Sequence, residues 1–315
     1  MSVFEAIIQG IVQGLTEFLP VSSSGHLAIT QHIMGNQGEE YLFFNVMLHI
    51  GTLVAVVAFY HKLIYRLIKE FCFMVKDIFT GKFKWSEMNR DRNLIMMLII
   101  GLLPLFLLFL PIPGTDMKIK DLADVFNQQA FLSVVAASLL VTSALLYAGI
   151  KANEATTLRY KKKGILTKKG AGRHSFNVVD AVCVGLGQFA AAVFPGLSRS
   201  GTTLAIGELR GINKQTALDY TFVLAIPSIV AAALLETKDA ISAPGGISIN
   251  ILPVIIGMVT AAVVGYLSIV IFKWFLKTDK TIIFVIYTAA IGLIMLAVSI
   301  IEMFTRTNLF TGLPL

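Results

Sequence analysis

The chain has 315 residues, of which 56% are hydrophobic and 14% are charged, and its mean hydropathy is +0.78. Soluble globular domains carry about 25% charged residues, so this composition excludes an ordinary water-soluble protein. The formal net charge of +7 does not indicate a nucleic-acid partner, because the basic residues lie mainly between apolar segments, where they set membrane orientation.

Six apolar segments are long enough to cross a bilayer, which takes about 20 mostly apolar residues. In chain order they are 44–60, 94–111, 130–150, 218–235, 251–272 and 282–303. They predict an all-α polytopic membrane protein with about six transmembrane helices.

Two further apolar segments, 3–30 and 178–208, are interrupted by proline, glycine and clustered serine. Residues 17–26 read EFLPVSSSGH, and residues 194–203 read FPGLSRSGTT. Non-helical backbone at membrane depth is tolerated only where it is buried in protein or lines a wet cavity. Each segment is therefore predicted to form a re-entrant helix pair.

The two interrupted segments also resemble each other in sequence. The matched positions are Gly10 with Gly185, Gln13 with Gln188, Pro20 with Pro195, Ser22 with Ser198, Ser24 with Ser200, and Gly25 with Gly201. Each is followed by three predicted crossings, an odd number, so the second copy enters the membrane in the opposite sense. The sequence thus predicts an inverted-topology repeat, with a first repeat in 1–150, a basic cytoplasmic loop in 151–176 and a second repeat in 177–315.

The charge distribution supports this arrangement. Loops 61–93, 151–176 and 273–280 are basic, whereas 112–129 and 236–250 each have one more acid than base. Positive-inside counting places the basic loops in the cytoplasm and both chain ends outside. The two interrupted segments then enter from opposite sides, and their tips are expected to meet near the midplane.

Ionisable groups inside a membrane are costly and mark functional sites, and Glu17 and Arg199 are the sharpest candidates. Gln13 precedes Glu17 by four residues, so the pair shares a helix face and could hold a hard cation or orient water. The guanidinium of Arg199 offers a planar fork of donors suited to phosphate. A purely structural ion pair between Glu17 and Arg199 is the competing interpretation.

The residues around Arg199 are typical of a phosphate cradle. Ser198 and Ser200 flank it, and Gly196 and Gly201 let the backbone approach a ligand closely. A turn that opens a helix also presents free N–H groups to an anion.

His26 follows the serine cluster Ser22, Ser23 and Ser24. A neutral imidazole can act as a base or nucleophile, although a lone histidine beside an apolar run is more often structural. Both interpretations stay open for His26, and a structural role is expected for His49.

These motifs resemble those of the undecaprenyl-diphosphate phosphatase family, also known for bacitracin resistance. The first family motif is Glu or Gln, three residues, then Glu, which Gln13 and Glu17 match, and the resemblance continues to Gly25 and His26. The second is Pro-Gly-x-Ser-Arg-Ser-x-x-Thr, which is matched by Pro195, Gly196, Ser198, Arg199, Ser200 and Thr203. The resemblance covers nearly the whole chain.

The resemblance implies a hydrolase of the bacterial plasma membrane that removes the terminal phosphate of undecaprenyl diphosphate, with its active site open to the outer face. The product is the lipid carrier of peptidoglycan precursors. The family depends on a divalent cation, here Mg²⁺ or Ca²⁺, and Gln13 and Glu17 are the expected ligands. Gln13 stands where many relatives have glutamate, so the site loses one negative charge.

The residues and the resemblance together assign roles to the site. Glu17, Ser23, His26 and Arg199 are the expected catalytic residues, with Ser23, His26 or water left open as nucleophile or base. The expected phosphate-binding residues are Ser22, Ser24, Gly196, Ser198, Arg199, Ser200, Gly201 and Thr203. The expected partners are a polyprenyl diphosphate substrate and membrane lipids, and a homodimer is left open. A lipid-phosphate flippase or secondary transporter is the alternative, because inverted repeats with broken helices are typical of transporters.

Overall fold

The computed structural model describes residues 1–35, 39–126, 132–166, 170–242 and 250–314. Within these ranges the protein is helical, and its only β-type pairings are isolated bridges. Six helical segments are long and apolar enough to cross a membrane, which confirms the predicted all-α polytopic class. They are α3 (Glu39–Phe79), α4 (Arg90–Leu102) with the 3₁₀ helix η2 (Leu103–Phe109), α6 (Leu132–Lys162), α9 (Lys214–Ser242), α10 (Ile251–Lys277) and α11 (Ile282–Thr305).

The two interrupted segments form helix pairs that break where proline and serine predict. The first pair is α1 (Val3–Phe18) with α2 (Ser23–Met34), and the second is α7 (Val178–Val193) with α8 (Arg199–Leu209). The second helix of each pair begins on a serine cap, because Ser22 Oγ accepts from the Gly25 N–H and Ser198 Oγ from the Gly201 N–H. The serine clusters are therefore helix starts, where a hydroxyl satisfies an otherwise unpaired amide.

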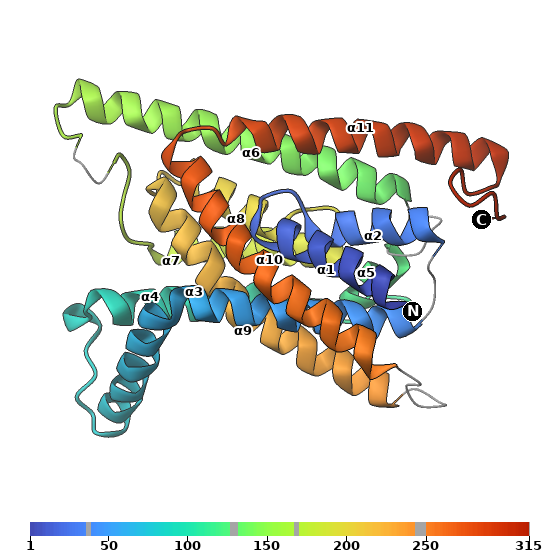
Figure 1. The fold of residues 1–315 in the computed structure, drawn as a ribbon. Helices are drawn as coiled ribbons and strands as arrows, with labels where there is room; N and C mark the ends of the chain where they lie inside the picture. The colour runs from blue at the N-terminus through green and yellow to red at the C-terminus, as the bar shows by residue number, and fades with distance from the viewer. Residues whose placement is uncertain (36–38, 127–131, 167–169, 243–249, 315) are drawn as a thin grey trace.

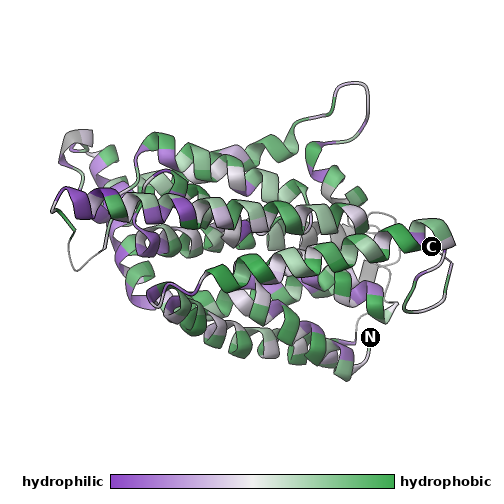
Figure 2. Ribbon diagram, turned by 90° about the horizontal axis from the view of Figure 1, so that it is seen from above, coloured by the Kyte–Doolittle hydropathy of each residue, from purple (hydrophilic) through white to green (hydrophobic). Residues whose placement is uncertain are grey.

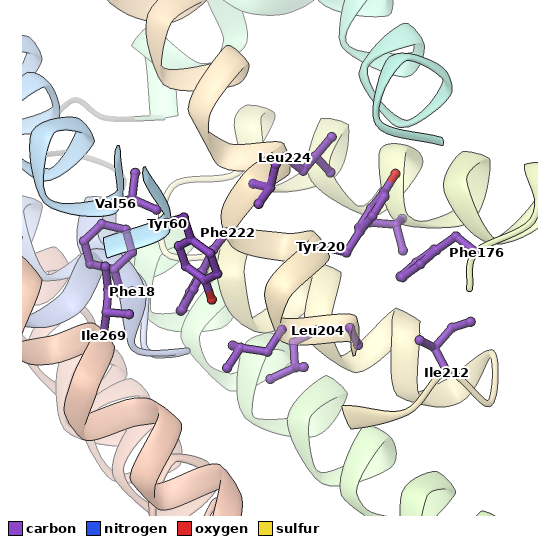
Figure 3. Packing of buried hydrophobic residues seen from close by; sticks show 14 of the residues in the cluster. Phe18, Val56, Tyr60, Phe176, Leu204, Ile212, Tyr220, Phe222, Leu224 and Ile269 are labelled. Atoms are coloured by element: carbon purple, nitrogen blue, oxygen red, sulfur yellow. The ribbon is translucent and has the colours of Figure 1, made fainter. Parts of the chain in front are cut away.

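The helix pairs pack between the long helices (Figure 1). Helix α1 lies against α10, α7 lies against α4, and α8 lies against α6 and α9, while α6 and α11 run side by side. Buried aromatic and aliphatic side chains join α1, α9 and α10 in the core, among them Phe18, Phe222 and Ile269 (Figure 3). The rings of Phe18 and Phe222 meet edge to face, with centroids 5.5 Å apart.

Polar residues gather at the end of the bundle opposite the two termini, and the middle is largely apolar (Figure 2). Helices α10 and α11 expose large apolar side chains along their length, including Val263, Ile286 and Leu293. An exposed apolar belt is the surface that a lipid-embedded protein presents, because lipid tails solvate such side chains.

Several segments predicted as loops are helical. Helix α3 continues past a kink at Tyr60, where φ is −98° and ψ is 16°, to Phe79, so the loop prediction for 61–79 was wrong. Charged residues lower the mean hydropathy there, although apolar residues such as Leu67 and Met74 still follow a helical period. Helix α6 runs to Lys162, into the segment predicted as a loop from 151, and α5 (Ile119–Phe126) lies within 112–129. Residues 127–131, 167–169 and 243–249, parts of the predicted loops and of the predicted 130–150 helix, lie outside the described residues.

Candidate active site

The turns of the two helix pairs meet each other inside the bundle. The Gly196 N–H donates to Ser24 Oγ at 3.4 Å, and Ser200 Oγ donates to the Leu19 carbonyl at 3.1 Å. A Cβ on Gly25 would lie 3.0 Å from Gly196 Cα, so the two backbones are in direct contact. The two motifs, far apart in the sequence, therefore form one site.

Gly196 and Thr142 fix the second turn against α6. Gly196 has φ of +92°, and a Cβ there would lie 2.5 Å from the Val135 carbonyl oxygen, so only glycine fits. Thr142 Oγ1 donates to the Gly196 carbonyl at 3.2 Å and accepts from the Ser198 N–H at 2.9 Å. This anchoring sets the direction in which α8 begins.

The centre of the site is the buried carboxylate of Glu17. Its Oε1 is paired with the Arg199 guanidinium, and its Oε2 accepts from Ser23 Oγ at 2.6 Å and from Gln13 Nε2 at 3.0 Å. His49 Nε2 lies 3.7 Å from Oε2. The Glu17 side chain is only 2% exposed, whereas that of Arg199 is 26% exposed, so the arginine can reach a ligand.

This cluster opens on a cavity of about 350 Å³ with one polar end and one apolar wall. The polar lining is Glu17, Ser22, Ser23, Ser24, His49, Lys120, Gln188, Ser198, Arg199, Ser200 and Ser228. The apolar lining comes mainly from η2, α7 and α9: Leu105, Leu108, Phe109, Ala191, Ala192, Leu197, Ala231, Ala232 and Leu235. The cavity therefore fits a ligand with a polar head and an apolar tail.

The electrostatics of the polar end favour an anion. Helices α2 and α8 both begin at this cavity, and the first N–H groups of a helix have no intrahelical acceptor. Two helix N-termini place partial positive charge there, and the side chains of Arg199 and Lys120 also line the cavity. The charges of Glu17 and Arg199 offset each other while they are paired, so the helix N-termini carry the preference for an anion in this state.

Some predicted site residues lie outside the cavity. Thr203 Oγ1 donates to the Arg199 carbonyl at 2.8 Å and to Thr221 Oγ1 at 3.0 Å, so it supports the start of α8. His26 points to α11, since Nδ1 lies 2.7 Å from the Ser22 carbonyl and Nε2 lies 2.8 Å from the Tyr287 hydroxyl. Gly196 and Gly201 shape the second turn, and the Gly201 N–H is held by the Ser198 cap.

The cavity also contains residues that the sequence did not single out as functional. His49 was expected to be structural, yet it faces the Glu17 carboxylate. Gln188 is the repeat counterpart of Gln13, which was the available signal for it, and Ser228 Oγ donates to its Oε1 at 3.3 Å. No sequence motif pointed to Lys120, because the residues around it do not reveal that α5 lies against a site formed by helices distant in the sequence.

The donor set fits a hard cation in part. Gln13 is fully buried, and its Oε1 has no hydrogen-bond partner among the described residues. Leaving a buried oxygen without a hydrogen bond costs free energy of folding. The Nε2 of the same Gln13 side chain donates to Glu17. The described residues contain no cluster of three or more His, Cys, Asp or Glu side chains suited to a metal. Mg²⁺ commonly takes one or two carboxylates with waters and substrate phosphates, so a sparse oxygen set is compatible with it.

The fold and site define a polytopic helical membrane protein with a buried Glu17–Arg199 pair at the polar end of a cavity that has an apolar wall. The chain belongs to the bacitracin resistance protein BacA family, whose model matches residues 6–294. An undecaprenyl-diphosphatase of Alkaliphilus metalliredigens is 36% identical over 96% of this chain and the whole of that protein. Proteins of the same name from Methanosphaera stadtmanae and Bacteroides fragilis are 33% and 36% identical, over 96% and 95% of this chain and 99% of each relative.

Proposed function

We propose that the protein is a membrane phosphatase that hydrolyses undecaprenyl diphosphate to undecaprenyl phosphate and phosphate. The observation that carries this proposal is the Glu17–Ser23–Arg199 cluster at the polar end of a cavity with an apolar wall. The names of the relatives support the same activity and favour it over a transporter. Returning the lipid carrier to peptidoglycan synthesis accounts for bacitracin resistance.

The polar end and the apolar wall of the cavity support one orientation of the substrate. The diphosphate lies against Arg199 and the first amides of α2 and α8, where positive charge is concentrated. The prenyl tail follows the apolar wall past Leu108 and Leu235 toward the lipid. In this orientation the terminal phosphorus would lie next to Ser23, which lines the same end of the cavity as Arg199.

Ser23 is the nucleophile in this mechanism, and Glu17 is its base. Ser23 Oγ already donates to Glu17 Oε2 at 2.6 Å, within the range for proton transfer. When the terminal phosphate takes the Arg199 guanidinium from Glu17, the carboxylate loses its compensating charge and becomes a stronger base. The two ring nitrogens of His26 contact the Ser22 carbonyl and the Tyr287 hydroxyl, so Ser23 is favoured over His26.

The reaction then runs in two displacements. Ser23 Oγ attacks the terminal phosphorus, its proton passes to Glu17, and the bond to the bridging oxygen breaks to release undecaprenyl phosphate. Water next attacks the phosphoserine, the Oγ–P bond breaks, Glu17 returns its proton to Ser23, and dihydrogen phosphate leaves. Arg199 and the helix amides stabilise the charge on the transferring phosphoryl group in both steps.

A divalent cation is part of the proposal. Gln13 Oε1 and Glu17 would hold Mg²⁺ or Ca²⁺. When bound, such an ion would neutralise charge on the phosphoryl oxygens.

We also propose that the chain is an inverted repeat in a bacterial plasma membrane and that the cavity opens to the outer face. Lys120 lines the cavity from α5, within the segment that positive-inside counting places outside. The lysines at 161–163 lie at the end of α6, in the segment assigned to the cytoplasm. A second copy of the chain is not required for the site, since all the residues invoked come from one chain.

Phosphate release from undecaprenyl diphosphate by purified protein in detergent tests the function, because a transporter needs two compartments and an enzyme does not. Ser23→Ala should abolish release. Ser268→Ala is the control, since Ser268 is also a helical serine, more deeply buried than Ser23, and its hydroxyl bonds only the Val264 carbonyl, at 3.0 Å, among the described residues. Unchanged release by Ser23→Ala would rule out this nucleophile, and no release by the unaltered protein would rule out the enzyme.

A further inference from the structure

The second half of α3 extends beyond any membrane crossing. Helix α3 has 41 residues, which corresponds to about 60 Å of helix, whereas the hydrocarbon core of a bilayer is about 30 Å thick. The helix kinks at Tyr60, and its later part turns away from the bundle and runs across the direction of the long helices (Figure 1). Residues 61–79 therefore form a separate arm at the polar end of the molecule.

One side of this arm is attached to the start of α4. Arg92 Nε lies 2.7 Å from Glu70 Oε1, and Arg92 Nη2 lies 2.7 Å from Asp77 Oδ2. Leu67 and Met74 are buried beside these pairs. These contacts fix the rotation of the arm about its own axis.

The adjoining side is apolar and exposed. Tyr65, Ile68, Phe71, Ile78 and Phe79 form this apolar face, and their exposed fractions range from 44% to 86%. At 100° per residue they share one broad stripe of the helix, apart from the carboxylates that bind Arg92. Such a stripe beside a polar face is typical of a helix that lies in the membrane interface.

A row of lysines borders the apolar face. Lys62, Lys69 and Lys76 are spaced by seven residues, or about two turns, so they lie along one edge, and all three are exposed. Among the described residues none of the three ammonium groups forms an ion pair, and Lys69 Nζ lies 5.9 Å from the Phe73 ring centroid. A file of cations beside an apolar stripe matches a bilayer surface that contains anionic headgroups.

We infer that residues 61–79 form an interfacial arm whose apolar face enters the bilayer surface while Lys62, Lys69 and Lys76 contact anionic lipid headgroups. The lysine row favours anionic lipid over a second copy of the arm as the partner of this face, because a second copy would bring like charges together. The bundle already holds the arm at the membrane, so little further ordering opposes the contact. Since α3 also carries His49 into the cavity, the arm anchors one of the helices that line the site.

The chain contains a suitable probe for this contact. Cys72 is exposed on the arm, within the apolar stripe and near its border with the lysine row, and Cys183 is the other cysteine. With Cys183→Ser, a polarity-sensitive fluorophore can be attached to Cys72 alone. The labelled full-length protein is then reconstituted in phosphatidylcholine with or without phosphatidylglycerol, and emission wavelength and quenching by iodide are measured.

The expected result is a blue shift and reduced iodide quenching when phosphatidylglycerol is present. Replacing Lys62, Lys69 and Lys76 by glutamine should abolish that lipid dependence, whereas glutamine at Lys161, Lys162 and Lys163 removes the same charge elsewhere and should leave it intact. Equal loss in both variants, or no effect of phosphatidylglycerol, would overturn the inference. A Cys72–Cys72 cross-link that forms in dilute reconstitution would assign the face to a second copy and would also overturn it.

Discussion

Replacement of Arg199 separates a catalytic arginine from a structural one. Lysine keeps the positive charge but not the planar fork, and alanine removes both. Losing a charge contact to a transition state typically costs about 3–4 kcal/mol, or roughly 100- to 1000-fold in rate. We expect a loss of this size in phosphate release for Arg199→Ala, and a similar loss for Arg199→Lys.

The same replacement also affects stability. Removing one partner of a buried ion pair costs about 3–5 kcal/mol when the other charge is left uncompensated. Here the cost should be smaller, because Arg199 is 26% exposed and Glu17 keeps its hydrogen bonds from Ser23 and Gln13. Glu17→Gln in the Arg199→Ala background removes the unpaired charge, so it should restore much of the stability without restoring turnover.

Thermal unfolding in detergent and phosphate release should be measured on the same preparation. Arg210→Ala is a suitable control, because Arg210 also pairs with a buried carboxylate, that of Asp180, but Arg173 remains to bind it. Its turnover should stay close to normal. An Arg199→Ala protein that melts early yet keeps near-normal turnover per folded molecule would show that Arg199 is structural, and the proposed site would be refuted.

Three further predictions follow from the site and the fold. Chelation should abolish phosphate release and Mg²⁺ or Ca²⁺ should restore it, with Gln13→Glu still active; full activity in excess chelator would remove the metal. Gly196→Ala should lower the melting temperature more than Gly81→Ala, since both have positive φ but only Gly196 meets backbone, and equal melting shifts would contradict this. Lys162→Cys should react only with membrane-permeant reagents and Asp116→Cys with impermeant ones added outside; the reverse pattern would contradict the proposed topology.

The features that the bilayer imposes could be predicted from the sequence. A lipid-facing helix must be long, apolar and unbroken, so the six spans and the two breaks are visible in composition alone. The sequence predicted that the turns of the two interrupted segments would meet, and it offered a Glu17–Arg199 ion pair as one interpretation of these two charges, which the structure brings together. These predictions depended only on the apolar pattern of each segment and on the odd number of predicted crossings in each half of the chain.

Features that depend on tertiary contacts could not be predicted in this way. The direction of His26 is set by Tyr287 on a helix far along the chain, and His49 reaches Glu17 only because α3 passes α1 at that level. Ser22 has φ of +76°, a conformation that non-glycine residues rarely adopt. In this conformation its Oγ accepts a hydrogen bond from the Gly25 N–H and caps α2. The arm at 61–79 is stabilised by Arg92, which lies on the next helix. A hydropathy average over the residues of the arm itself therefore could not predict that the arm is held in place.

The pairing of Glu17 with Arg199 also bears on how the site discriminates among ions. Arg199 Nη2 is paired with Glu17 Oε1, so an incoming anion that binds this nitrogen must compete with the carboxylate. Singly charged ions such as chloride gain little from that exchange, whereas a multiply charged phosphate gains contacts to the arginine and to two helix starts at once. After hydrolysis the same competition works in the other direction. In the proposed mechanism, recapture of Arg199 by Glu17 would expel the freed phosphate, so turnover and selectivity would depend on the same reversible exchange.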